Sequence, residues 1–143
     1  VNAADRELRR LGHEVVVLQD GTYGSRQTRA DSYGASVYVA CHINAGLAGR
    51  KGDRGEVYHW PGSTRGARIA AAVSVEPLKV CPWTSKAIPA ETDRVRSTIS
   101  GVKATALCFE PAFLDGEAGL PFLRNALNVE AIGVALARGI AAA

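Results

Sequence analysis

The sequence predicts a single-domain α/β protein, a three-layer sandwich in which helices flank a twisted sheet of mixed or mostly parallel strands. Short β-rich runs alternate with segments of helical periodicity, and this alternation is typical of α/β folds. The chain has 143 residues, which suits one domain. It contains no internal repeat or low-complexity segment, and no boundary that suggests a second domain.

Five short runs are predicted to form strands. Residues 14–18 are almost all apolar and follow Gly12, which would end a preceding helix. The other four runs are residues 36–41, 56–60, 95–99 and 105–110. We expect residues 36–41 and 105–110 to be buried strands, because apolar side chains fill most of both runs.

Helices are predicted between these strands and at the end of the chain. Ser25 is the expected cap of a helix that runs to about Tyr33, and Ser63 is the expected cap of a helix over residues 64–75. A final helix is expected over residues 120–141, where apolar residues recur at spacings of three and four. Residues 46–55 are expected to be a polar loop, and residues 76–93, with three prolines, mostly loop.

The beginning of the chain has the pattern of the second half of a helix. Leu8 and Leu11 have apolar helical spacing, arginines surround them, and Gly12 follows as a stop. The sequence also contains no Met. We therefore expect the domain to have further residues upstream of Val1.

Charge and cysteine content exclude several classes of protein. The net charge of +3 would help association with an anionic polymer such as a cell wall, but it is too small and too scattered to indicate nucleic-acid binding. No apolar stretch is long enough for a membrane span. The three cysteines include no CxxC pair, which argues against a disulfide framework and against a structural zinc knuckle.

Two predicted strands end in residues that can carry chemistry. His42 follows residues 36–41, and Glu110 closes residues 105–110. Open α/β sheets place their active sites at the carboxyl ends of strands. Imidazole is a common metal ligand, and a carboxylate beside a metal-bound water can act as a general base. The period of two places Cys41 on the opposite face from His42, whereas Cys108 shares the face of Glu110 as an inert core thiol.

Structural explanations for the same residues remain open at this stage. A strand-end histidine satisfied by the backbone accounts for His42 equally well from spacing alone, and Glu110 alone could be an ordinary rim carboxylate. His13 is expected to be a surface residue. The same reading is favoured for His59, although it has some claim to a position in a groove.

Several motifs, in order along the chain, resemble those of the zinc-dependent N-acetylmuramoyl-L-alanine amidases. That family has an Arg, an Ala-Asp-like pair and a strand that ends in a Ser-Ile-His-Ala-Asn-Ala-like motif. The corresponding residues here are Arg26, Ala30-Asp31 and Ala40-Cys41-His42-Ile43-Asn44-Ala45. Gly55-Glu56-Val57-Tyr58 is similar to the family's Gly-x-Glu-x-Tyr strand, and residues 106–115 resemble the segment that delivers its catalytic Glu. The resemblance covers roughly residues 8–140.

The resemblance implies a reaction and a cofactor. It implies hydrolysis of the amide between N-acetylmuramic acid and the L-alanine of the peptidoglycan stem peptide, with Zn²⁺ polarising the carbonyl and activating a water. Glu110 would be the general base, His42 one zinc ligand, and Asn44 a substrate-binding residue. The family's other two ligands, a His in a Gly-His-Gly-like loop and a Glu, would lie upstream of Val1. Cys41 and Ile43 replace the Ile-like and Ala residues of the family motif.

The resemblance also implies a setting. An endolysin or autolysin of this kind would act in the cell wall, periplasm or extracellular space, or be phage-encoded and act on the host wall. Peptidoglycan would be its partner, and residues of the 46–55 loop and of residues 77–89 would border the substrate groove.

Two kinds of rival function are considered beside the amidase. The first is a non-catalytic wall-binding module on the same fold, which would keep the groove without the metal. The second is a different hydrolase or a nucleotide-binding protein. No GxGxxG or Walker pattern follows residues 14–18, and the chain has no GxSxG elbow. A Cys/His protease is disfavoured because Cys41 points away from His42.

Overall fold

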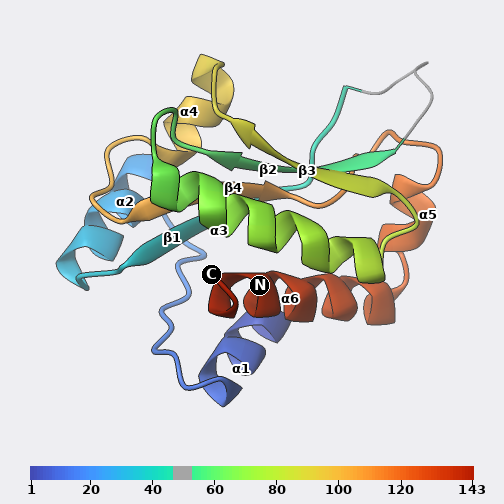
Figure 1. The fold of residues 1–143 in the computed structure, drawn as a ribbon, viewed down its shortest axis with the longest axis horizontal. Helices are drawn as coiled ribbons and strands as arrows, with labels where there is room; N and C mark the ends of the chain where they lie inside the picture. The colour runs from blue at the N-terminus through green and yellow to red at the C-terminus, as the bar shows by residue number, and fades with distance from the viewer. Residues whose placement is uncertain (47–52) are drawn as a thin grey trace.

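The computed structural model describes residues 1–46 and 53–143, and their centre is a four-stranded mixed sheet (Figure 1). The strands are β1 (Val37–Cys41), β2 (Arg54–His59), β3 (Thr84–Pro89) and β4 (Thr105–Glu110), in the spatial order β1-β4-β2-β3. The pairs β1–β4 and β2–β3 are parallel, whereas β2–β4 is antiparallel. The predicted α/β sandwich with a mixed sheet is thus confirmed.

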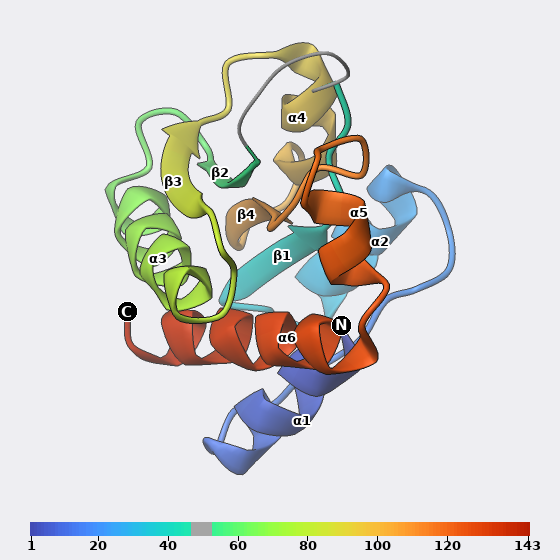
Figure 2. The same cartoon turned by 90° about the vertical axis from the view of Figure 1, so that its right-hand side faces the viewer.

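Helices cover both faces of this sheet (Figures 1 and 2). On one face lie α3 (Thr64–Val75) and α6 (Ala126–Ala141), and α1 (Asn2–Arg10) packs on the outside of α6. On the other face lie α2 (Tyr23–Ser32) and α4 (Asp93–Ile99). Two short elements complete the fold, the 3-10 helix η1 (Glu76–Lys79) after α3 and α5 (Gly119–Leu123) before α6.

The alternation of side chains along β4 divides the core in two. Leu107 and Phe109 face α3 and α6, and they belong to the larger cluster of buried apolar residues. Ala106 and Cys108 face α4, where Ile99 packs against them. Glu110 continues this second series, because side chains two positions apart on a strand share a face. The sheet therefore presents Glu110 on the same side as α4.

Most predicted elements are present with small shifts in their ends. The helix over residues 64–75 is confirmed, and the hydroxyl of Ser63 accepts a hydrogen bond from the backbone N–H of Gly66 at 3.0 Å as its cap. The second helix begins earlier than predicted, because Thr22 rather than Ser25 caps it. The final helix is shorter than predicted: a new cap at Asn125 separates α5 from α6.

Two predicted strands are wrong. Residues 14–18 have no strand partner among the described residues, and the Arg9 guanidinium donates to the carbonyl of Val15. Residues 95–99 belong to α4 instead of a strand. Val95 and Ile99 both pack into the cluster beneath α4, and their spacing of four residues is the spacing of a helix face.

The two predicted loops are also corrected in part. Residues 76–93 contain η1, all of β3 and the start of α4, so that prolines stand at the edges of regular elements. Arg54 and Gly55 belong to β2, while residues 47–52, including the predicted groove residues Arg50 and Lys51, lie outside the described residues. Within residues 1–46 and 53–143, no helix is long and apolar enough to cross a lipid bilayer.

Candidate active site

His42 and Glu110 lie side by side at the carboxyl ends of two neighbouring parallel strands. In the β1–β4 register the last pair is Cys41 and Phe109, and the backbone N–H of His42 donates to the Phe109 carbonyl at 3.0 Å. The two candidate residues each stand one position beyond this pair, on strands about 4.8 Å apart. The fold thus brings together the two residues that the sequence indicated separately.

His42 is half-buried between an aromatic ring and cationic side chains. The Tyr23 ring lies with its centroid 5.7 Å from that of the imidazole, and the Arg26 guanidinium lies over the Tyr23 ring at 5.1 Å. Burial lowers the pKa of His42, and the positive charges of Arg26 and Arg94 lower it further. A neutral imidazole keeps a lone pair with which it can bind a metal or accept a proton.

Glu110 is a buried carboxylate, with 8% of its surface exposed. Burial raises its pKa above the ordinary carboxyl value, and the negative charge of Glu56 raises it further. Arg94, Cys108 and Asn44 act in the opposite direction. Beneath Glu110, the Cys108 Sγ donates to its Oε1 at 3.8 Å. Burial raises the pKa of this thiol to about 12, so that Cys108 stays protonated, in agreement with its prediction as an inert core thiol.

Glu56, on β2, is a site residue that the sequence reasoning missed. It is directly opposite Glu110 in the antiparallel register and 5% exposed. Its Oε2 accepts hydrogen bonds from Asn44 Nδ2 at 2.9 Å and from the Tyr58 hydroxyl at 2.6 Å, and its Oε1 accepts from Arg54 Nε at 2.6 Å. A carboxylate inside a strand with an apolar neighbour was the available signal, but only the strand order places it beside Glu110.

Asn44 connects the two strand ends. Its backbone N–H donates to the Ala112 carbonyl at 3.0 Å, and its carbonyl accepts from the Leu114 N–H at 2.8 Å. Its side chain is engaged as well, because Oδ1 accepts from the Ala45 N–H while Nδ2 donates to Glu56. The predicted substrate-binding role of Asn44 stays a prediction; its amide donates to Glu56 and also lowers the pKa of Glu110.

A groove of about 890 Å³ opens between residues 13–19 and β1. Apolar side chains line its walls, among them Val15, Val17, Val37 and Val39. His42 lines one end together with Tyr23 and Arg26. Cys41, expected on the face opposite His42, also lines this groove and is exposed. The groove gives His42 access from solution.

The described residues do not complete a zinc site. No group of three or more His, Cys, Asp or Glu side chains within residues 1–46 and 53–143 could hold a metal ion. A structural or catalytic zinc takes at least three protein ligands, and His42 is the single predicted ligand among the described residues. His13 is exposed, as predicted, and the half-buried His59 places Nδ1 3.1 Å from the Trp60 carbonyl oxygen.

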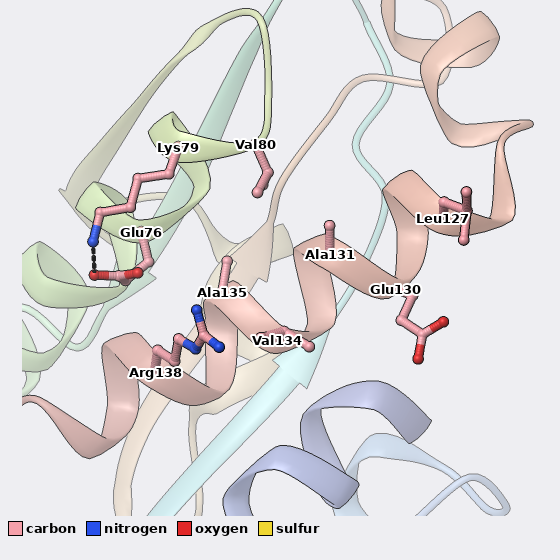
Figure 3. A pocket seen from close by; sticks show the side chains of 9 residues that line it. All are labelled: Glu76, Lys79, Val80, Leu127, Glu130, Ala131, Val134, Ala135 and Arg138. Atoms are coloured by element: carbon pink, nitrogen blue, oxygen red, sulfur yellow. Dashed lines mark hydrogen bonds and ion pairs between the residues drawn. The ribbon is translucent and has the colours of Figure 1, made fainter.

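A smaller hollow of about 360 Å³ lies between η1 and α6 (Figure 3). Its polar side chains include the ion pair of Lys79 with Glu76, at 2.5 Å, and Arg138. Its lining residues include neither His42 nor Glu110. The candidate site therefore stays at the strand ends.

Several solved structures with the same fold are N-acetylmuramoyl-L-alanine amidases. No model of a known protein family matches the sequence, and a search of curated proteins finds no significant match. The amidase AmiC2 of Nostoc punctiforme superposes with a TM-score of 0.84 at 19% identity, over 97% of this chain and 77% of that one. The catalytic domain of the CD27L endolysin targeting Clostridia Difficile gives 0.76 at 21% identity, over 97% and 77%.

Cwp6 from Clostridium difficile has the same fold within a much longer chain. It superposes with a TM-score of 0.84 at 19% identity, over 96% of this chain, which spans 23% of Cwp6. The catalytic domain of CwlV, an N-acetylmuramoyl-L-alanine amidase, gives 0.74 at 19% identity. The helices and the mixed sheet described above thus have the fold of the catalytic domains of N-acetylmuramoyl-L-alanine amidases.

Proposed function

We propose that this chain is the catalytic part of a zinc-dependent peptidoglycan amidase. It would hydrolyse the amide between N-acetylmuramic acid and the L-alanine of the stem peptide. The observation that carries the proposal is the pair of His42 and Glu110, side by side at neighbouring strand ends beside an open groove. The amidase fold and the motif resemblance around both residues support it.

Glu110 would act as the general base of this reaction. Its carboxylate would take a proton from the attacking water and return it to the leaving amine. A base works best when its pKa lies near the working pH, and burial moves the pKa of Glu110 in that direction. The Arg94 charge acts in the opposite direction and favours the ionised form of Glu110.

The proposed zinc ion would need ligands in addition to His42. His42 would be one ligand through its neutral imidazole, but the described residues do not fit a zinc ion by themselves. Residues 47–52 contain no His, Cys, Asp or Glu, so further ligands would come from outside these 143 residues. Such an enzyme would act in the cell wall, periplasm or extracellular space, or on a host wall if phage-encoded.

The proposal is tested by cleavage of purified peptidoglycan, with the 143-residue chain and with a chain extended upstream. We expect the extended chain to release stem peptides with a free L-alanine amino group, identified by mass spectrometry. Glu110→Gln is expected to slow release by about 100-fold or more, because the variant cannot accept the proton. Glu117→Gln, exposed and seven residues further on, is the matched control. An unchanged rate in Glu110→Gln would remove Glu110 from the mechanism.

Elemental analysis tests the metal separately. Near one zinc per extended chain is expected, lost in His42→Ala and retained in His13→Ala, which changes an exposed histidine. The 143-residue chain alone is expected to retain little zinc. Zinc that survives in His42→Ala would contradict the assigned ligand.

A non-catalytic wall-binding module is the second candidate. One observation favours it: the described residues bring no three metal-binding side chains together. Co-sedimentation with peptidoglycan, without release of peptides and without zinc in either chain, would make this module the better account.

A further inference from the structure

Two buried carboxylates face one another across β2 and β4. Glu56 and Glu110 are paired directly in the antiparallel register, and their exposed fractions are 5% and 8%. Side chains in such a pair have Cβ atoms about 4.5–5.5 Å apart, and like charges in this position destabilise a sheet. A protein that retains this arrangement in its interior needs compensating contacts, and paired carboxylates of this kind are frequent at functional sites.

The compensating contacts converge on Glu56. Three donors reach its carboxylate: the Asn44 amide, the Tyr58 hydroxyl and the Arg54 guanidinium. Arg54 is in turn held over the Phe113 ring, 4.6 Å from its centroid. Glu110, in contrast, has the weak Cys108 thiol donor beneath it and shares the Asn44 amide with Glu56. The two facing carboxylates are therefore unequal, because Glu56 accepts from three side-chain donors, one of them the Arg54 guanidinium.

The position of Asn44 depends on the same contact. Asn44 stands two residues beyond His42, and its backbone is bonded to Ala112 and Leu114 in the segment that follows Glu110. Its side-chain amide closes this arrangement onto β2 through Glu56. Asn44 thus joins the segments that follow β1 and β4, and Glu56 joins Asn44 to β2.

We propose that Glu56 is a positioning residue of this site, which fixes the Asn44 side chain beyond His42 and faces Glu110 with a negative charge that strengthens it as a base. The strengthening of a base has a role only if Glu110 accepts a proton, so this part rests on the proposed function. The contact with Asn44 and the electrostatic effect on Glu110 do not.

Burial raises the pKa of Glu110, and Glu56 is the charged group beside it that raises this pKa further. Arg94 from α4 carries a positive charge and lowers the pKa of Glu110. Tyr58 from β2 is neutral, because burial and its bond to Glu56 raise its pKa. Cys108 below is a protonated thiol, and the uncharged Asn44 amide lowers the pKa of Glu110 through its hydrogen bond. His42, the neighbour on β1, has a lowered pKa and is neutral.

The test is a carbon-13 NMR titration of the Glu110 side-chain carboxyl in metal-free protein. Glu56→Gln removes the negative charge opposite Glu110. The protonated form of Glu110 is then less favoured, and its pKa is expected to fall. We expect the acid dissociation constant of Glu110 to rise about tenfold, the effect of one charge at this separation in a partly solvated site. The side-chain amide protons of Asn44 are expected to shift and to exchange faster with water.

Tyr58→Phe is the matched control, since it removes one donor from Glu56 and keeps the charge. It is expected to leave the Glu110 dissociation constant within about twofold of the parent, because the charge is unchanged. If Glu56→Gln does not fold, Glu56→Asp replaces it: the charge stays but retracts by one methylene, and a smaller rise is expected. An unchanged Glu110 titration in the folded Glu56 variant would overturn the proposal.

The two proposals fail separately in this design. A titration that moves as expected, in a chain that cleaves no peptidoglycan, would support the coupling of Glu56 to Glu110 and count against the amidase. Cleavage together with an unmoved titration would support the amidase and overturn the role of Glu56.

Discussion

At the scale of single residues, Trp83 fixes the backbone immediately beyond the candidate base. Its indole Nε1 donates to the Pro111 carbonyl at 2.8 Å, and both groups are buried. Its ring packs edge-on against Phe122, with centroids 5.0 Å apart. Because Pro111 follows Glu110, this hydrogen bond determines the direction in which the chain leaves β4.

Trp83→Phe tests this anchor. The variant keeps an aromatic ring but leaves the Pro111 carbonyl without its donor and creates a small void. We expect the free energy of unfolding to fall by about 1–3 kcal/mol. Urea unfolding followed by circular dichroism measures it. The exposed Trp60 provides the control, and Trp60→Phe is expected to change stability by less than about 0.5 kcal/mol. Equal effects of the two substitutions would contradict the anchor.

The sequence predicted His42 and Glu110, but not Glu56, for a physical reason. A residue after an apolar strand is at the carboxyl end of that strand whatever the rest of the fold, and parallel neighbours bring such ends together. Glu56 lies inside a strand, and its neighbour depends on the antiparallel pairing of β2 with β4. That register is a property of the whole sheet, which local sequence does not contain. Trp83 was missed for the same reason, since its partner lies 28 residues away.

At the scale of elements, α6 approaches its neighbours through two glycines. A Cβ at Gly139 would lie 2.5 Å from Val73 Cα in α3, and one at Gly133 would lie 2.8 Å from Ala3 Cβ in α1. No substituent fits at the first contact, since the atom in the way belongs to the backbone. α6 can therefore lie close to α3 only with glycine at position 139.

Gly139→Ala is expected to destabilise the protein by about 1–3 kcal/mol, because the added methyl pushes α6 away from α3. Gly24→Ala in α2 is the matched control: no atom lies within 4 Å of the new Cβ. Alanine there is expected to leave stability unchanged or raise it by up to about 1 kcal/mol, through its higher helix propensity. Thermal melts of both variants compare the two, and a stable Gly139→Ala would show that the helices can separate without cost.

Element predictions succeeded where local signals decide the structure. The cap at Ser63 and the apolar run over residues 105–110 are local, and both elements are found within the predicted bounds. The prediction for residues 95–99 failed because five residues with three β-branched side chains fit a strand as well as a helix. Packing onto the sheet selects the helix. Residues 14–18 have a strand sequence, but a strand also requires a partner, and no described residue supplies one.

At the scale of the whole molecule, the two edges of the sheet are β1 and β3, and a groove runs along the β1 edge. The order β1-β4-β2-β3 leaves β1 at one edge, and the groove separates its free side from residues 13–19. No backbone hydrogen bond joins residues 16–18 to another described residue. Composition and alternation predicted the α/β class of this fold. They could not predict the strand order, because the order depends on long-range pairing.

Hydrogen exchange is expected to follow this asymmetry. The amides of Leu107 and Cys108 lie in the central strand β4, between β1 and β2, so they exchange only when the sheet opens. Amides of residues 16–18 have no such protection, and we expect them to exchange at least about 1,000-fold faster, as measured by NMR in deuterated buffer. Val73, inside α3, is a control for ordinary helical protection. Slow exchange at residues 16–18 would mean that another strand pairs with them in solution, and that the groove beside His42 is filled.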